Sequence, residues 1–242
     1  MRLRFIKHIR NFFLFFNKKS GGVEQPLKLT QEQWDKTEKE FLAQLYSYFS
    51  EITDSIQNLR TNKDNPFIKS QLGLAFVGAD TFARFHLIFE GQRKNLDFDN
   101  KRRFKKWLNI FVFTNENNIY QLHKEKIKCD AGRAWRLRNS LLHFYSFPEP
   151  ENGLREQFVY NFSDSLRQKM EIFLKEEGHK IILIDAYYLI DAILHGFLLQ
   201  LQYFKKMIEN SPNQYKDAVL FAHEIVMRDG SYTVKFDVKE DK

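Results

Sequence analysis

Arg138, Asn139 and His143 lie within one short segment of the chain and carry side chains suited to phosphate chemistry. An arginine stabilises the negative charge that builds on a phosphate as its ester bond is cleaved. A histidine changes charge near neutral pH, so it can accept a proton from a hydroxyl group or donate one to a leaving oxygen. The asparagine amide offers both a donor and an acceptor. Together these three side chains could cleave RNA without a metal ion.

The spacing between Arg138 and His143 is awkward for a single helix. Five residues carry the chain about 140° past alignment, so the two side chains do not share one helical face. They converge if the helix ends or distorts near His143, or if a second subunit completes the site. On spacing alone, the simpler interpretation is an exposed arginine and a histidine satisfied by a local partner.

The segment Trp135–Tyr145 adds information to this spacing. Its pattern Arg-Asn-x3-His, entered by Trp-Arg-Leu, resembles the Arg-x4–6-His signature of the HEPN superfamily. Its ending, His-Phe-Tyr, resembles the His-x-Tyr extension of HEPN toxins that are paired with nucleotidyltransferase-type antitoxins. The resemblance covers about eleven residues. It implies a ribonuclease that acts as a toxin or as an effector of antiviral defence, including abortive infection and CRISPR-associated systems.

The resemblance also implies a role for each matching residue. Arg138 and His143 would be the catalytic pair, and Asn139 would orient the histidine or the scissile phosphate. Cleavage would need no metal and no cofactor, and 2′-hydroxyl attack would leave a cyclic phosphate and a 5′-hydroxyl. Tyr145 would be a candidate for inhibitory adenylylation by an antitoxin or another defence-system protein. A homodimer is expected, because family members bring two motifs together in one cleft.

Two other functions remain open from the sequence. One is a noncatalytic HEPN-like module that binds RNA, a nucleotide or a partner protein. The other is a membrane-associated accessory protein that contacts the membrane surface through residues 1–19. That segment carries six cations and no acid, and its apolar residues recur every three or four positions. Because its longest apolar run has five residues, it is too short to span a bilayer, and packing on the domain or on a second subunit is the competing interpretation.

The formal charge of +7 is concentrated in three runs. Besides residues 2–19, the runs 93–106 and 123–138 are strongly basic, which is what a polyanionic partner such as RNA needs. Lys101, Arg102 and Arg103 open a segment, 101–107, in which cations are interleaved with aromatic residues. They are candidate RNA contacts, although we expect Phe104 and Trp107 to be buried. The other candidate RNA contacts are Arg133 and Arg136, which precede the motif.

The chain is expected to be mainly α-helical, an HEPN-like bundle with minor β decoration. Residues 1–22 would form a basic amphipathic helix and a Gly-rich joint, and residues 23–242 one helical domain. Helices are expected from a capping box at Thr30 to about Arg60, from Asn65-Pro66 to near Gly91, and from Asp99 with a break at 115–118. Further helices are expected after Asp130, from Ser163 or Asp164 up to Gly178, over 185–209 and from Pro212. Strands are expected at 158–162 and 232–238, and 181–184 fits either a strand or a helix start.

The single cysteine, Cys129, excludes an internal disulfide and any cysteine-pair zinc site, so a cytoplasmic setting is expected, with peripheral membrane contact left open. Cys129 itself is expected to be a small buried residue and not a nucleophile.

No metal site is expected from Asp185 and Asp191. Asp80 and Arg84 are four residues apart in a helix, so a surface ion pair is expected, although an auxiliary polar residue facing the cleft is the alternative.

Overall fold

The computed structural model describes residues 29–61, 67–92, 99–148, 153–178 and 180–230. These residues are mainly helical, which confirms the expected fold class. The expected N-terminal helix, the joint at 20–22 and the strand at 232–238 lie outside the described residues. The helices are α2 (Gln31–Arg60), α3 (Ile68–Phe89), α4 (Asn100–Trp107), α5 (Asn118–Ile127), α6 (Ala131–Phe144), α7 (Asp164–Glu176), α8 (Ala186–Asn210) and α9 (Pro212–Gly230). A π-helical turn, η2 (Leu108–Val112), joins α4 to α5, and the strands are β1 (Arg155–Val159) and β2 (Ile181–Asp185).

Local capping signals place several helix starts where the sequence predicts them. Thr30 and Gln33 form a complete capping box at the start of α2. Asp99, Asp130 and Ser163 each accept a backbone N–H bond at the start of α4, α6 and α7. Each side chain satisfies an N–H group that would otherwise lack a partner in the first helical turn. The Asn65-Pro66 start of the second helix lies outside the described residues.

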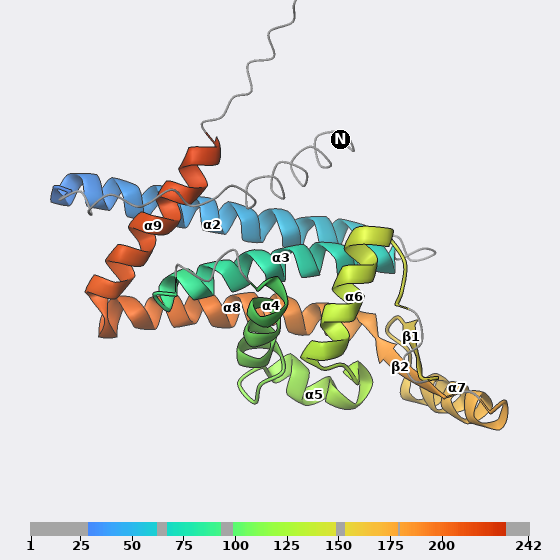
Figure 1. Ribbon diagram of the computed structural model, residues 1–242. Helices are drawn as coiled ribbons and strands as arrows, with labels where there is room; N and C mark the ends of the chain where they lie inside the picture. The colour runs from blue at the N-terminus through green and yellow to red at the C-terminus, as the bar shows by residue number, and fades with distance from the viewer. Residues whose placement is uncertain (1–28, 62–66, 93–98, 149–152, 179, 231–242) are drawn as a thin grey trace, which may run out of the picture.

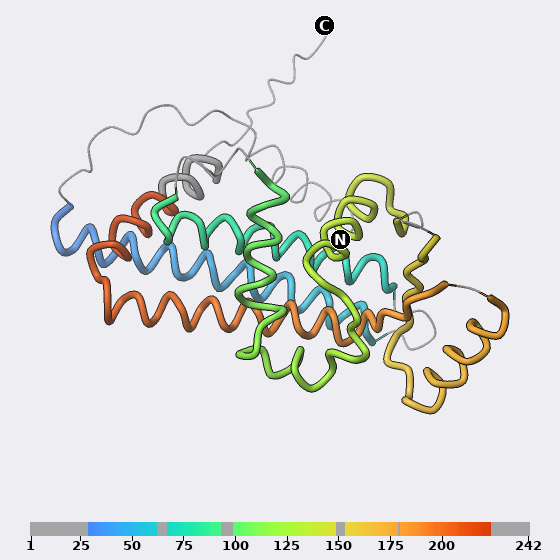
Figure 2. Tube along the Cα trace, turned by 60° about the horizontal axis from the view of Figure 1, so that its bottom comes forward, coloured from blue at the N-terminus to red at the C-terminus, as the bar shows by residue number. Residues whose placement is uncertain are grey.

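Three long helices form the body of the molecule. α2, α3 and α8 lie side by side, and α9 crosses one end of them (Figure 1). The shorter helices α4 and α6 cross α3 next to each other, as the turned view in Figure 2 also shows. By length and composition α3 is the single helix among the described residues that could span a membrane, yet most of it is buried.

The centre of the bundle is packed with aromatic rings. Phe82 of α3 stacks on Phe197 of α8 with ring centroids 4.5 Å apart. Gly78 makes this close approach possible, because a Cβ atom at that position would lie 2.7 Å from the Phe197 ring. Trp107 donates to the side chain of Gln200, whose amide donates in turn to the Phe82 carbonyl at 2.9 Å. The core therefore ties α3, α4 and α8 together by packing and by satisfied polar groups.

The third helical stretch breaks where the sequence predicts, and a buried asparagine organises the break. After η2 the chain turns at 113–117 and resumes as α5. The Asn117 side chain donates to the carbonyls of Phe111 at 2.9 Å and Ala192 at 2.8 Å. Its Oδ1 accepts from the Tyr120 amide and caps α5. Because this amide satisfies groups on three segments, the turn is held against α8.

The strands β1 and β2, which α7 connects, pair in parallel with Arg155 opposite Ile181. The segment 181–184, ambiguous from sequence, is therefore a strand. The strand expected at 158–162 was placed wrongly, because β1 ends at Val159. The Asp185 carboxylate accepts from the amides of Asn161 at 2.9 Å and Phe162 at 3.2 Å, which turns the chain away from the sheet.

Candidate functional site

The motif lies on α6, a helix with a defined start and end. The carboxylate of Asp130 accepts from the Arg133 amide at 2.9 Å, as expected for an N-cap. Tyr145 ends the helix in the left-handed conformation, at φ 50°. The helices α3 and α4 both pack against α6. The sequence signals that bound α6 thus also determine where Arg138 and His143 are presented.

Arg138 is buried and bound to an acid on a neighbouring helix. Its Nε donates to Asp80 Oδ2 at 2.8 Å, and its Nη2 donates to the same oxygen. Both side chains are 9% exposed. Arg138 also lies over the Trp135 ring, with the guanidinium carbon 5.1 Å from the ring centroid. The surface ion pair expected for Asp80 is therefore wrong, because α6 covers this carboxylate and supplies its cation.

Asn139 connects the buried arginine with the exposed face of α6. Its Oδ1 accepts from Arg138 Nη1 at 3.0 Å, so the amide is oriented by the same guanidinium that binds Asp80. These contacts occupy three of the five N–H donors of Arg138. Asn139 and His143 are four residues apart and share a helical face.

His143 is exposed at the end of α6, whereas Arg138 is buried. Its ring makes an edge contact with Phe144, with centroids 6.2 Å apart. Phe144 is 79% exposed. The awkward spacing expected from the sequence is therefore real: one α6 helix presents the arginine inward and the histidine outward. A reacting phosphate would have to lie at the edge between these two faces.

Tyr145 is held by contacts with the first turn of α3. Its hydroxyl lies 2.8 Å from Ser70 Oγ, and its carbonyl accepts from Lys69 Nζ at 3.3 Å. The same ammonium group lies 5.5 Å from the Tyr145 ring centroid. The side chain is 59% exposed, so a modifying enzyme could approach it. Its role as an adenylylation site stays a prediction.

Arg133 and Arg136 are turned toward a buried acid. Arg136 donates to Glu156 on β1, and Arg133 Nε lies 3.7 Å from the same carboxylate oxygen. The Glu156 side chain is 2% exposed, so this acid needs its cations. Both arginines help to hold β1 against α6. Their contact with RNA stays a prediction.

The cations of α4 divide by face. Lys101 and Arg102 are exposed, whereas Arg103 is buried and donates to Asn100 Oδ1 at 2.6 Å. Phe104 and Trp107 are fully buried, as expected. Arg103 shares the buried side of the helix with these rings, so the folded surface does not offer it to RNA as it offers Lys101 and Arg102.

The sequence offered Asp80 only as the alternative to a surface ion pair, an auxiliary polar residue facing the cleft, and it did not single out Glu156. Asp80 is the single acid in the apolar helix α3, and a lone acid in such a helix needs a buried cation. Which cation it binds depends on packing between residues 58 positions apart. Local patterns carry no information about such a contact.

Two other groups capable of chemistry are buried, Cys129 just before α6 and His86 on α3. Burial raises the pKa of the Cys129 thiol far above its ordinary value, which agrees with an unreactive cysteine. Burial lowers the pKa of His86 to about 4, with a smaller opposing effect from Glu90. Its ring packs edge-on against Phe111, with centroids 5.2 Å apart. Across the described parts of the chain, no group of three or more His, Cys, Asp or Glu side chains is placed to hold a metal ion.

The comparisons with known proteins give no relative: no protein-family model, no curated protein and no solved structure matches this chain. The HEPN resemblance therefore depends on the segment Trp135–Tyr145 alone.

Proposed function

We propose that this protein is a metal-independent endoribonuclease of the HEPN type that acts as a homodimer. The observation that carries the proposal is the hydrogen-bonded chain Asp80–Arg138–Asn139, which leads from the core to the helical face of His143. A buried acid holds the guanidinium in one orientation, and the guanidinium orients the amide. Preorganised donors of this kind stabilise charge with little rearrangement during the reaction.

The proposed reaction is a transesterification within one RNA strand. His143 accepts the proton of a 2′-hydroxyl, and the 2′ oxygen forms a bond to the adjacent phosphorus. The bond from phosphorus to the 5′ oxygen breaks, and that oxygen leaves as a hydroxyl after taking a proton from a general acid. Arg138 donates to the phosphate oxygens through the N–H groups that do not contact Asp80 or Asn139. The products are a 2′,3′-cyclic phosphate and a 5′-hydroxyl.

A second copy of the chain would complete this site. Because one α6 helix presents Arg138 inward and His143 outward, Arg138 of one copy would act with His143 of the other. The exposed end of α6, which carries His143 and the highly exposed Phe144, is a suitable place for two copies to meet. Such an arrangement gives each cleft two motifs.

RNA cleavage in EDTA tests the proposal. We expect the wild-type protein to cleave single-stranded RNA and His143→Ala to lose activity by roughly 100-fold or more, since general acid–base catalysis contributes this much. His195→Ala is a matched control, because it removes a histidine from α8 and leaves α6 intact. Equal activity of wild type and His143→Ala would contradict the proposal. RNA binding without cleavage by the wild type would favour the noncatalytic module instead.

A further inference from the structure

Most cations in the basic run 123–138 are held by carboxylates. The ion pairs are Lys126–Asp164, Lys128–Glu171, Arg133–Glu156, Arg136–Glu156 and Arg138–Asp80. This run was one source of the positive charge expected to attract RNA. Because its charges are mostly neutralised within the fold, its net attraction for a polyanion is small.

The cations on the outer side of α4 are not paired with carboxylates in this way. Lys101, Arg102, Lys105 and Lys106 form no ion pair with any residue that the structure describes. The nearby acid Asp99 uses its Oδ1 to accept from the Arg102 amide at 2.8 Å and so serves as the helix cap. Four positive charges thus remain together on a single helical turn and a half.

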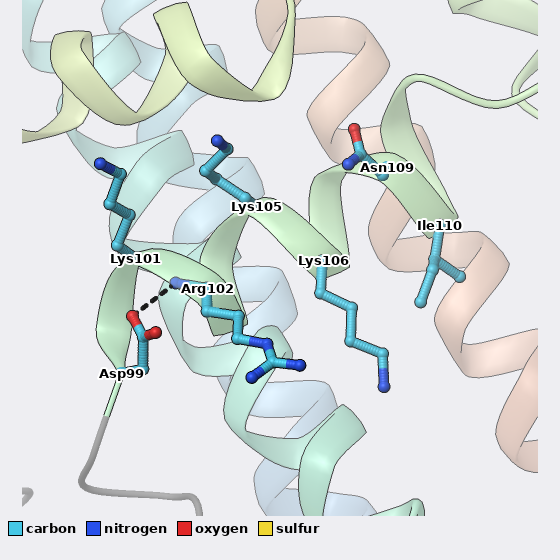
Figure 3. A pocket seen from close by; sticks show the side chains of 7 residues that line it. All are labelled: Asp99, Lys101, Arg102, Lys105, Lys106, Asn109 and Ile110. Carbon is cyan, nitrogen blue, oxygen red and sulfur yellow. Dashed lines mark hydrogen bonds between the residues drawn. The ribbon is translucent and has the colours of Figure 1, made fainter.

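These four cations line an open hollow of about 710 Å³ (Figure 3). Lys101 and Lys105 extend from one side of α4, and Arg102 and Lys106 extend from the other. The remaining lining residues are Asp99, Asn109 and Ile110. Residues four apart on a helix are about 6 Å apart along its axis, so the cations form two short rows. Two rows of cations suit a chain of phosphates better than a single small anion.

The buried side of α4 holds this surface in place. Phe104 and Trp107 are fully buried, and Trp107 donates to Gln200 of α8. The Phe104 ring also contacts Trp135 of α6, with centroids 5.7 Å apart. Trp135 in turn lies against Arg138. The hollow therefore has a rigid base and adjoins the helix that carries the motif.

We infer that the α4 hollow binds the phosphate backbone of single-stranded RNA and is the main electrostatic contact of the described surface with its substrate. It adds Lys105 and Lys106 to the RNA contacts expected from the sequence and leaves out Arg103. The choice of RNA as the polyanion rests on the proposed function. A strand bound along α4 would extend toward α6, which packs against α4 and carries the motif.

A membrane surface is a poorer match for this hollow. Interfacial helices insert apolar side chains below the headgroups. The one apolar residue that lines the hollow is Ile110, which is 38% exposed. A cationic hollow with a single apolar residue to insert matches a flexible phosphate chain better than a flat bilayer.

The test measures RNA binding in full-length protein that carries His143→Ala, so that cleavage does not interfere. The probe is a fluorescent single-stranded RNA of about 20 nucleotides, followed by anisotropy in EDTA over a range of salt concentrations. The test variant replaces the four α4 cations by alanine. The control variant removes the same charge from exposed lysines elsewhere: Lys169, Lys175, Lys205 and Lys206.

We expect the α4 variant to lose affinity by at least about tenfold, and the salt slope to fall by up to about 2.8, since each phosphate contact to a single strand contributes about 0.7. The control should stay within about twofold of its parent. Equal losses in both variants, or no loss in the α4 variant, would overturn the inference. So would an α4 variant that loses binding to phosphatidylserine vesicles but keeps its affinity for RNA.

Two checks keep the result interpretable. Thermal unfolding should give the same Tm for all proteins, because the replaced side chains are on the surface. If the fourfold variant unfolds, Lys105→Glu is compared with Lys205→Glu, and equal RNA affinity of these two overturns the inference. Because binding is measured without cleavage, an inactive wild-type enzyme would contradict the proposed reaction and leave this binding result standing.

Discussion

At the scale of single residues, the Arg138 guanidinium serves both the fold and the site. It neutralises Asp80, an acid that α3 and α6 bury between them, and it orients Asn139. A buried charge without its partner is costly, whereas two charges removed together are replaced by apolar contacts at little cost. The structural and the chemical contribution of Arg138 can therefore be separated by mutation.

We predict that Arg138→Met destabilises the protein by about 3–5 kcal/mol, because it leaves the Asp80 carboxylate buried and unpaired. The double variant Asp80→Leu/Arg138→Met should recover most of this loss, and neither variant should cleave RNA. Urea unfolding followed by circular dichroism measures both stabilities. A double variant that is folded and fully active would show that Arg138 has a structural role alone.

At the scale of elements, sequence patterns predict what is local and miss what depends on packing. The caps at Thr30, Asp130 and Ser163 were predictable because each acts within its own first helical turn. The end of β1 was not, because Asp185, 24 residues later than Asn161, terminates the strand. The segment that carries the motif was likewise visible in the sequence, whereas the pairing of Arg138 with Asp80 was not.

The contact between α3 and α8 depends on a similar long-range feature at Gly78. We predict that Gly78→Ala destabilises the protein by about 1–3 kcal/mol, because the new methyl group would overlap the Phe197 ring. Gly73→Ala, in the same helix, should instead stabilise it by about 0.5–1 kcal/mol, since no atom lies within 4 Å of its added Cβ. Thermal or urea unfolding of the two variants checks this, and a Gly78→Ala protein as stable as wild type would contradict the packing described.

At the scale of the whole molecule, the single chain separates the parts that the proposed reaction needs. Arg138 faces inward on α6 and His143 faces outward, so one copy does not bring both side chains to the same cleft. The α4 hollow is on a helix that packs against α6. A dimer that joins the ends of two α6 helices would combine these parts.

We predict that two inactive variants restore activity when mixed, if Arg138 of one subunit acts with His143 of the other. In a random mixture of Arg138→Lys and His143→Ala, half of the dimers are mixed and each has one intact site, so about a quarter of wild-type activity should return. The mixture is refolded together and assayed for RNA cleavage. Recovery no greater than the sum of the separate variants would argue against a shared site.

The ends of the cleaved RNA test the central claim most directly. Wild-type protein in EDTA should give a 2′,3′-cyclic phosphate on one fragment and a 5′-hydroxyl on the other, because His143 activates the 2′-hydroxyl and no metal takes part. The His143→Ala protein should give neither product above background. Cleavage that disappears in EDTA, that leaves a 5′-phosphate, or that survives His143→Ala unchanged would contradict the account.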